Sequence, residues 1–416
     1  MNQSVSDDAN QSRIFRLCCL ALTVTSMTFA IRAGILGQLG TEFGLSNEEL
    51  GWVNAMAFLG FPVATMIGGP LYNMLGAKKL VSLAFICHLA GLVLTILAGG
   101  FWGLLISTFL IGFANGSVEA GCNPLVAETY PKEKTRMLNR FHVWFPGGIV
   151  IGALISNAMT SAGMGWQLQV GVILIPTLIY GVLLARTVFP KLEDEIHSTL
   201  ANFKNLFSPL YIVLVLCMTL TATAELGTQQ WIERILGASG ASPMIILAMI
   251  TGLMAVGRYF AGPLIHRLNP VGVLLGSAIF TSAGIFFMSQ ASGNLIYLAA
   301  IIFALGVTYF WPTMLGCVAE YTPKTGPLGM SLIGGVGMFA VSMWNPVIGG
   351  WIDSARDSAE NLNLTAQQMD VLVGQEVLTK LLTFPLVLIL VFAVLFWVMR
   401  RPDGQLAAAP AQSADK

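Results

Sequence analysis

Long apolar stretches alternate with short polar segments from one end of this chain to the other. A helix needs roughly 20 mainly apolar residues to cross the hydrocarbon core of a bilayer. Twelve stretches meet that length, and their boundaries are uncertain by a few residues. They are residues 14–40, 49–71, 79–98, 101–128, 140–162, 166–189, 208–236, 243–265, 271–291, 294–319, 327–352 and 376–400. The pattern predicts an all-α membrane protein with twelve transmembrane helices.

The amino-acid composition also indicates a protein that folds within a lipid bilayer. Of the 416 residues, 55% are hydrophobic and 10% are charged, whereas soluble domains carry about 25% charged residues. All six cysteines fall inside apolar runs without metal-ligand spacing, so we interpret them as packing residues and expect no metal site. The sequence has no constellation typical of an enzyme: no Ser/His nucleophile pair, no HExxH and no phosphate-binding loop. We therefore expect no enzymatic activity.

The basic residues are distributed unequally between the two sides of the predicted bundle. One set of alternate segments contains sixteen Lys and Arg residues, and the opposite set contains three. Because cytoplasmic loops carry the excess of basic residues, both termini are predicted to be cytoplasmic. We expect a multi-pass protein of the cell membrane, in bacteria the inner membrane.

Two polar segments are longer than the other loops. Residues 190–207 are charged and mildly amphipathic, so they predict a cytoplasmic linker between a six-helix bundle at 1–189 and a second at 208–400. Residues 353–375 are acidic, and Thr365 and Gln368 within them have capping-box spacing, which favours a short helix. The tail at 401–416 is predicted to be a disordered cytoplasmic segment.

Two short motifs recur at nearly the same offset. Gly69-Pro70-Leu71 returns as Gly262-Pro263-Leu264, 193 residues later. The end of the fourth apolar stretch, AETYPK at 127–132, returns as AEYTPK at 319–324, 192 residues later. This recurrence predicts duplication of a six-helix unit. An offset of six helices preserves orientation, so the repeats are parallel, which is the arrangement of the major facilitator fold.

Three ionisable residues lie well inside the predicted spans: Arg32, Glu119 and Glu225. Intramembrane charges are costly and generally mark a functional site. Asn115 and Asn123 are each four residues from Glu119, so the three side chains share one helix face. We interpret such polar faces as lining a water-filled lumen, with Asn115 and Asn123 as solute-binding positions. Arg32 is interpreted as a counter-ion or a solute clamp. A static buried bridge between Arg32 and a glutamate is the alternative.

Further polar and aromatic residues are candidates for contact with a solute. Trp231 and Trp311 are candidates for stacking on the face of a sugar ring, although anchoring at the membrane interface is the commoner use of tryptophan. Gln229 and Asn345 are candidates for hydrogen bonds to hydroxyl groups, with helix–helix bonding as the alternative. His142 begins the fifth span, where it serves either pH sensing or loop anchoring. Glycines spaced by four, as at 112 and 116, favour close helix contact.

Four motifs resemble the fucose–proton symporter family of the major facilitator superfamily, including its sodium-dependent glucose transporter relatives. They are Glu119-Ala120-Gly121-Cys122-Asn123-Pro124, Leu138-Asn139-Arg140-Phe141-His142, Ala224-Glu225-Leu226-Gly227 with Trp231, and Phe310-Trp311-Pro312-Thr313. The resemblance implies a central cavity lined by the first, fourth, seventh and tenth helices. It also implies that Glu119 couples transport to a cation.

The sequence departs from this resemblance in two places. Between the second and third spans, Asn73 and Met74 replace the Asp-Arg pair that is usual in the superfamily. We interpret Asn73, Gly69, Gly262 and His142 as gating positions. The first span has no acidic residue and carries Arg32 instead, which resembles the anion–cation symporters that carry sugar acids.

These observations predict a secondary active transporter that works by alternating access. The expected activity is H⁺- or Na⁺-coupled symport of a hexose or related sugar, and the alternative is symport of an organic anion with Arg32 as carboxylate clamp. Glu119 is expected to be neutralised in the loaded carrier and to pair with Arg32 in the empty one. Glu225 is expected either to bind sugar hydroxyls or to share the cation. We expect a monomer without a cofactor, in contact with a small solute and lipid and with no nucleic acid.

Overall fold

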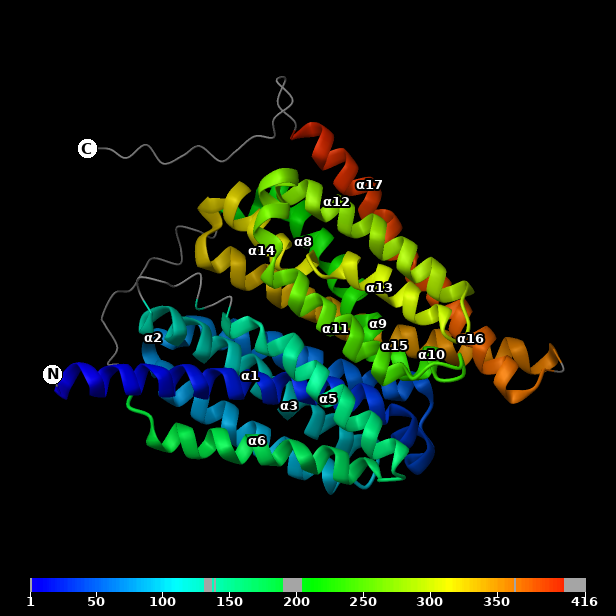
Figure 1. Ribbon diagram of the computed structural model, residues 1–416, viewed down its shortest axis with the longest axis horizontal. Coiled ribbons are helices and arrows are strands. Elements are labelled where there is room, and N and C mark those ends of the chain that lie inside the picture. The colour runs from blue at the N-terminus through cyan, green and yellow to red at the C-terminus, as the bar shows by residue number, and fades with distance from the viewer. Residues whose placement is uncertain (1, 131–136, 138–139, 190–203, 363, 400–416) are drawn as a thin grey trace.

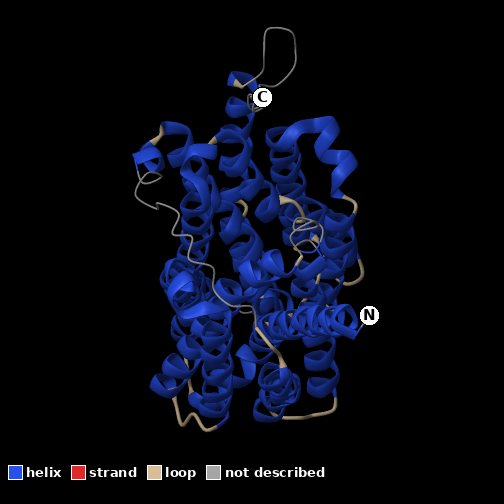
Figure 2. Ribbon diagram, turned by 90° about the vertical axis from the view of Figure 1, so that its left-hand side faces the viewer, coloured by secondary structure: helices blue, strands red, loops and turns tan. Residues whose placement is uncertain are grey.

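The computed structural model describes the whole chain except residues 1, 131–136, 138–139, 190–203, 363 and 400–416. Every regular element in the described part is helical, and short loops join the helices (Figure 2). Eleven helical segments there are long and apolar enough to cross a membrane, and a shorter apolar helix, Pro243–Tyr259, lies where the eighth span was predicted. The predicted twelve-span, all-α fold is confirmed.

The first half of the chain forms five described helices. They are α1 (Asn2–Phe43), α2 (Asn47–Ile96), α3 (Phe101–Thr129), α5 (Trp144–Ser161) and α6 (Trp166–Arg186). Helix α2 contains the second and third spans, joined at a sharp break at Gly76. These helices pack chiefly on one another, with α3 along α2 and with α5 and α6 along α1.

The second half contains more helices because several of its spans are interrupted. They are α8 (Pro209–Ala222), α9 (Thr228–Gln230), α10 (Ile232–Leu236), α11 (Pro243–Tyr259), α12 (Ala261–Gln290), α13 (Leu295–Val307), α14 (Phe310–Tyr321), α15 (Gly326–Ala359), α16 (Ala366–Leu381) and α17 (Thr383–Val398). A single π-helical turn, Thr223–Gly227, connects α8 to α9. Short 3₁₀ turns occur at Lys204–Phe207, Pro323–Thr325 and Glu360–Leu362.

The backbone itself repeats at the offset found in the sequence. Gly76 in α2 has φ 74° and ψ 159°, and Asn269 in α12 has φ 56° and ψ 166°. The two positions are 193 residues apart. Positive φ favours glycine and, among other residues, asparagine. Both halves therefore reverse direction at the same place in the repeat, which supports the duplication.

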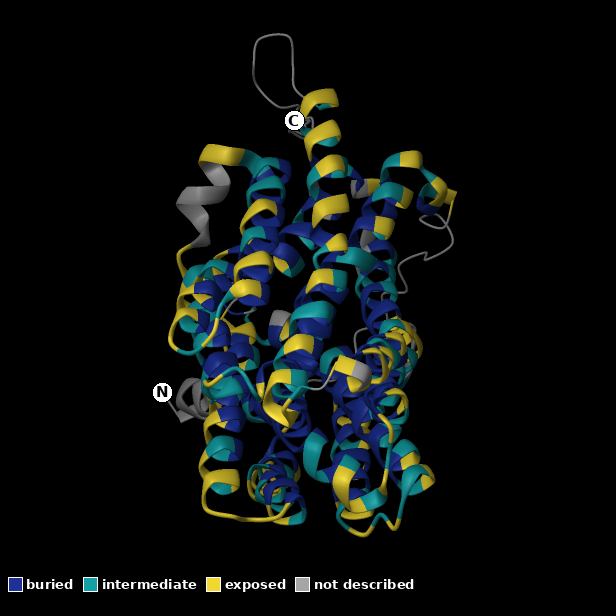
Figure 3. Cartoon of the chain, turned by 90° about the vertical axis from the view of Figure 1, so that its right-hand side faces the viewer, coloured by how far each residue is buried: buried dark blue, intermediate teal, exposed yellow. Residues whose placement is uncertain are grey.

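The two halves meet at one end of the molecule and diverge toward the other. Their ribbons converge where α10 and α16 lie and separate toward the end where α1 begins and α17 ends (Figure 1). We call the first end the far side and the second the terminal side. The helices carry their exposed residues on outward faces and their buried residues between helices (Figure 3). Much of this outward surface is apolar, as on α17, which suits contact with lipid.

Helices α2 and α15 form the most extensive contact between the halves. Near the far side they touch backbone to backbone, because Gly51 lies against Pro346 and Gly349 lies against the Asn47 carbonyl group. Ser342 of α15 donates a hydrogen bond to the Ala55 carbonyl oxygen at 2.7 Å. This packing closes the far side.

The structure tests the predicted short helix within residues 353–375. The capping box at Thr365 and Gln368 is confirmed, and it begins α16. This helix is longer than predicted, because it continues through Leu382 into the last span instead of ending within the loop. Most of the predicted linker, and the predicted tail, lie outside the described residues.

Close contact at the paired glycines of α3 is confirmed, and it gives a stability prediction. A Cβ added to Gly112 would overlap with the Ala57 carbonyl oxygen of α2, and one added to Gly116 would overlap with that of Phe61. Backbone atoms cannot rotate away, so Gly112→Ala is expected to destabilise the fold by about 1–3 kcal/mol. Thermal unfolding in detergent measures this. Gly171→Ala on α6, where no atom lies within 4 Å of the new Cβ, is the matched control; equal unfolding temperatures would contradict the prediction.

Candidate functional site

Arg32, in the second half of α1, connects the two halves of the protein. Its side chain is buried, with 7% exposed. Nε donates to Asn54 Oδ1 of α2 at 2.9 Å, and Nη2 donates to Gln230 Oε1 of α9 at 2.9 Å. The guanidinium group lies 5.1 Å from the ring centroid of Phe29 and 5.7 Å from that of Phe58. Arg32 forms no ion pair within the described part of the chain.

The expected pairing of Arg32 with a glutamate is therefore wrong for this conformation. Two neutral amides hold the guanidinium group instead. The reason is geometric, because Glu119 is hydrogen-bonded to Asn123 and Glu225 is paired with Arg258. The positive charge remains without a described negative counterpart.

An aromatic layer separates the two halves beside Arg32. Phe29, Phe58 and Phe61 of the first half contact small and aliphatic side chains of the second. Those side chains are Ala222, Leu226, Met338 and Val341. Phe145 and Trp311 pack against the same cluster from opposite halves. Of the predicted solute-contacting aromatics, Trp311 therefore lies at the contact between halves.

Glu119, Asn123 and His142 form a hydrogen-bonded chain. Asn123 Nδ2 donates to Glu119 Oε2 at 2.6 Å, one turn away on α3. His142 Nε2 lies 3.0 Å from Asn123 Oδ1, so this ring nitrogen is the donor. His142 is exposed and Glu119 is partly buried. The structure thus brings together three predicted site residues and connects a carboxylate in the middle of a span to an exposed imidazole.

Glu225 lies in the π-helical turn Thr223–Gly227, with 4% of its surface exposed. Its Oε1 accepts a bond from Arg258 Nη2 of α11 at 3.3 Å, and Arg258 Nε donates to the Thr308 carbonyl oxygen at 2.9 Å. Glu225 Oε2 is buried and has no partner in the described chain. Turns of this kind often occur at functional sites.

Arg258, the partner of Glu225, was not among the predicted site residues. By the positive-inside rule it belongs to the sixteen basic residues of the cytoplasmic set. A usable signal was present, because a carboxylate inside a span requires a partner and Arg258 is the basic residue within the eighth predicted span.

Two predicted solute ligands are engaged inside their own halves. Asn115 Nδ2 donates to Thr28 Oγ1 at 3.2 Å, and its Oδ1 lies 2.8 Å from His88 Nε2. His88 Nδ1 in turn lies 2.9 Å from the Tyr180 hydroxyl group. Gln229 is buried, and its Nε2 donates to the sulfur of Met254 at 3.7 Å. The structure does not bring Asn115 or Gln229 to the contact between halves.

Two other predicted solute-contacting residues, Trp231 and Asn345, are hydrogen-bonded to each other. Trp231 Nε1 donates to Asn345 Oδ1 at 3.0 Å, and both residues are fully buried. They join the seventh span to α15 in this conformation. The side-chain surroundings of Asn73, Gly69 and Gly262 lie outside the description. Their gating roles stay predictions.

A family model described as Major Facilitator Superfamily matches residues 18–345 of the chain. The chain belongs to this superfamily. The finer resemblance to fucose–proton symporters stays a prediction.

Three curated relatives of this chain illustrate the range of similar proteins. The putative niacin/nicotinamide transporter NiaP of Bacillus subtilis is 22% identical, over 78% of this chain and 83% of its own length. The gentisate transporter of Corynebacterium glutamicum is 23% identical, over 70% and 69% respectively. The galactose–proton symporter of Escherichia coli K12 is 28% identical, but over 41% of this chain and 38% of its own length.

Solved structures show the same superfamily fold. A bacterial homologue of the human lysosomal transporter Spinster, crystallised in an inward-facing conformation, has TM-score 0.75 and 14% identity over 92% of this chain and 96% of its own. The D-xylose–proton symporter has TM-score 0.71 and 15% identity, over 89% and 96%. At such identities the likeness concerns the fold alone.

In this member of the superfamily a polar cluster holds the far side closed. Asp353 of α15 accepts bonds at the N-terminus of α2, from the Asn47 amide N at 3.2 Å, Asn47 Nδ2 at 2.7 Å and the Glu48 amide N at 2.9 Å. Arg234 Nε donates to Asn47 Oδ1 at 2.9 Å. An anion at a helix N-terminus is stabilising. We call these four residues the far-side latch.

Asp353→Asn is expected to loosen the far-side latch. The substitution removes the negative charge that the Asp353 carboxylate places at the N-terminus of α2. A hydrogen bond to a charged group contributes about 1.5–3 kcal/mol. The far side should then open about tenfold more often. A cysteine at Ala55, buried beneath Ser342, reports opening by its rate of labelling with a polar maleimide, because the six native cysteines are buried.

The matched control is Asp357→Asn, one turn further along α15, where the carboxylate is exposed. Its labelling rate should equal that of the parent protein. Equal rates for Asp353→Asn and the control would show that the latch does not hold the far side closed.

Proposed function

We propose that this protein is a cation-coupled symporter of a small organic anion, working by alternating access with Arg32 as the carboxylate clamp. The observation that carries the proposal is the buried guanidinium group at the contact between halves, held by neutral amides. A charge in mid-membrane costs about 2.5–3.5 kcal/mol on the insertion scale, and a bound carboxylate would offset that cost.

The geometry of Arg32 suits this role. A guanidinium group has five N–H donors in a planar fork that matches a carboxylate, and two of them bind Asn54 and Gln230. The other donors are available to a ligand. Gln230 belongs to the second half, so a solute that displaced its amide would alter a bond between the halves. Binding would thereby affect the equilibrium between conformations.

The aromatic layer and the relatives support the same solute class. Phe29 and Phe58 flank the guanidinium group and would contact the apolar body of an organic acid. The transporters named for niacin and gentisate match this chain over most of its length. Niacin and gentisate are aromatic acids, which combine a ring with a carboxylate, whereas nicotinamide, also in the first name, is a neutral amide.

Coupling is assigned to Glu119, with Glu225 as a second candidate. Glu119 accepts a hydrogen bond from Asn123, and Asn123 is hydrogen-bonded to the exposed His142. This chain of polar groups would give a proton or Na⁺ a route to Glu119. Glu225 is engaged by Arg258 and offers one unpaired oxygen, Oε2. The contacts between α2 and α15 at the far side lie on the side opposite the one that we expect to be cytoplasmic.

Symport of a hexose is the second candidate. It is favoured by the local match to the galactose–proton symporter and by Trp311, which has part of its ring surface exposed beside the aromatic layer. Aromatic rings present the apolar faces on which sugars stack. In this case Arg32 would donate hydrogen bonds to hydroxyl groups.

Thermal stabilisation of the purified protein distinguishes the two solute classes. Niacin and gentisate are expected to raise the unfolding temperature of the parent protein and not that of Arg32→Gln, whereas galactose and xylose leave both unchanged. Arg356→Gln, on an exposed far-side ion pair, is the matched control and should respond like the parent. Stabilisation by the neutral sugars alone would replace the first candidate by the second.

A further inference from the structure

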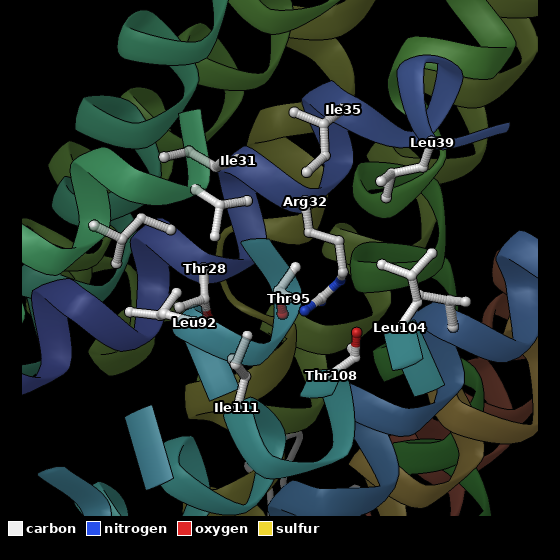
Figure 4. A pocket seen from close by; sticks show the side chains of 13 residues that line it. Thr28, Ile31, Arg32, Ile35, Leu39, Leu92, Thr95, Leu104, Thr108 and Ile111 are labelled. Atoms are coloured by element: carbon white, nitrogen blue, oxygen red, sulfur yellow. The ribbon is translucent and has the colours of Figure 1, made fainter. Parts of the chain in front are cut away.

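A small cavity lies inside the first half, beside Arg32. Its volume is about 30 Å³, and side chains of α1, α2, α3 and α6 line it (Figure 4). Apart from Arg32, its polar lining consists of three threonines, Thr28, Thr95 and Thr108. The remaining lining is aliphatic, so the cavity is an apolar chamber with one cation.

The guanidinium group of Arg32 points into this cavity toward the Thr108 hydroxyl group (Figure 4). The Thr95 and Thr28 hydroxyls donate to backbone carbonyl oxygens, those of Gly91 at 2.8 Å and Thr25 at 2.6 Å. Thr108 makes no hydrogen bond to the described chain and is 4% exposed. The cavity therefore combines an uncompensated cation with one free hydroxyl donor.

We propose that this cavity binds a small inorganic monoanion, chloride, between Arg32 and Thr108 as the counter-ion of the buried guanidinium group. A cavity needs about 10–15 Å³ to hold one water molecule, so this cavity has room for a monatomic ion somewhat larger than water. Water would fill the space but leave the charge uncompensated. The apolar walls disfavour strongly hydrated anions such as sulfate and phosphate, because those anions lose more hydration on entry.

The site does not depend on the identity of the solute. If the solute is an organic anion, its carboxylate approaches Arg32 from the side of Gln230 and competes electrostatically with chloride. If the solute is a sugar, chloride remains the resident counter-ion. The proposal therefore concerns the N-terminal half itself and goes beyond the transport function.

Equilibrium binding of ³⁶Cl⁻ to the purified full-length protein in chloride-free sodium gluconate tests the proposal without any solute or gradient. The parent protein is expected to bind chloride saturably, with bromide competing and gluconate and sulfate not. Its unfolding temperature should rise with chloride against matched gluconate. The absence of saturable binding would overturn the proposal, whatever the outcome of transport assays.

Variants then locate the site. Thr108→Val, which removes one hydrogen bond to a charged ligand, is expected to weaken chloride binding about tenfold, and Arg32→Gln to abolish it. Thr95→Val, at a lining hydroxyl already bonded to the backbone, is the matched control and should bind like the parent. Size-exclusion profiles establish that each variant is folded. Chloride binding that survives both Thr108→Val and Arg32→Gln would show that the ion binds elsewhere.

Discussion

Glu119→Gln is expected to abolish uphill accumulation of the solute while exchange across the membrane continues. The amide mimics the neutral form of the carboxylate and can still bond to Asn123, so the loaded carrier closes and reopens. The glutamine side chain can no longer take up or release a cation. A cation gradient therefore cannot drive accumulation of the solute. An ionised Glu119 without a partner would disfavour occlusion by about 2.5–3.5 kcal/mol, which is roughly a hundredfold in population.

Proteoliposomes separate these two activities. Counterflow with solute on both sides measures exchange, and uptake driven by an imposed pH or Na⁺ gradient measures accumulation. Glu376→Gln, in an exposed pair with Lys380, is the matched control, since such pairs contribute little. Gradient-driven uptake that survives Glu119→Gln would remove the coupling role from this residue.

Arg258→Gln is expected to destabilise the second half by about 3–5 kcal/mol. The substitution leaves Glu225 buried in the π-helical turn without its cation, and Oε2 already has no described partner. Glu225→Gln should cost less, because the side chain of Arg258 is 22% exposed and keeps its bond to the Thr308 carbonyl oxygen. Thermal unfolding of the purified variants measures the difference.

The double substitution provides the internal check. Combining Glu225→Gln with Arg258→Gln removes both charges and should recover most of the stability that Arg258→Gln alone loses, because no charge then remains buried. Arg356→Gln, whose partner Asp370 is 40% exposed, should change stability by less than about 1 kcal/mol. A double variant no more stable than Arg258→Gln would show that the pair has no electrostatic coupling.

The architecture was predictable because the bilayer leaves few alternatives. Backbone amides in lipid must bond within their own segment, so an apolar stretch of sufficient length becomes a helix wherever it occurs. The eighth span, Pro243–Tyr259, was found by this rule although it is short. The repeat offset was also readable, and it recurs in the backbone at Gly76 and Asn269.

The candidate site was predictable in part. The sequence located the three charges, and the four-residue spacing placed Asn123 beside Glu119, as the structure shows. It did not find His88 between Asn115 and Tyr180, nor Asn54 beside Arg32. Those bonds connect different helices, and helical spacing contains no information about neighbours on another helix.

The sequence by itself determined that the chain spans the membrane twelve times, in two related units, with ionisable groups inside the bundle. Only the tertiary structure decided the partners: amides for Arg32, Arg258 for Glu225, and Asp353 for the N-terminus of α2, 306 residues from Asn47. The physical reason is that transfer of apolar segments into lipid depends on local composition. Satisfaction of a buried charge depends on which donor the packing of distant helices brings within reach.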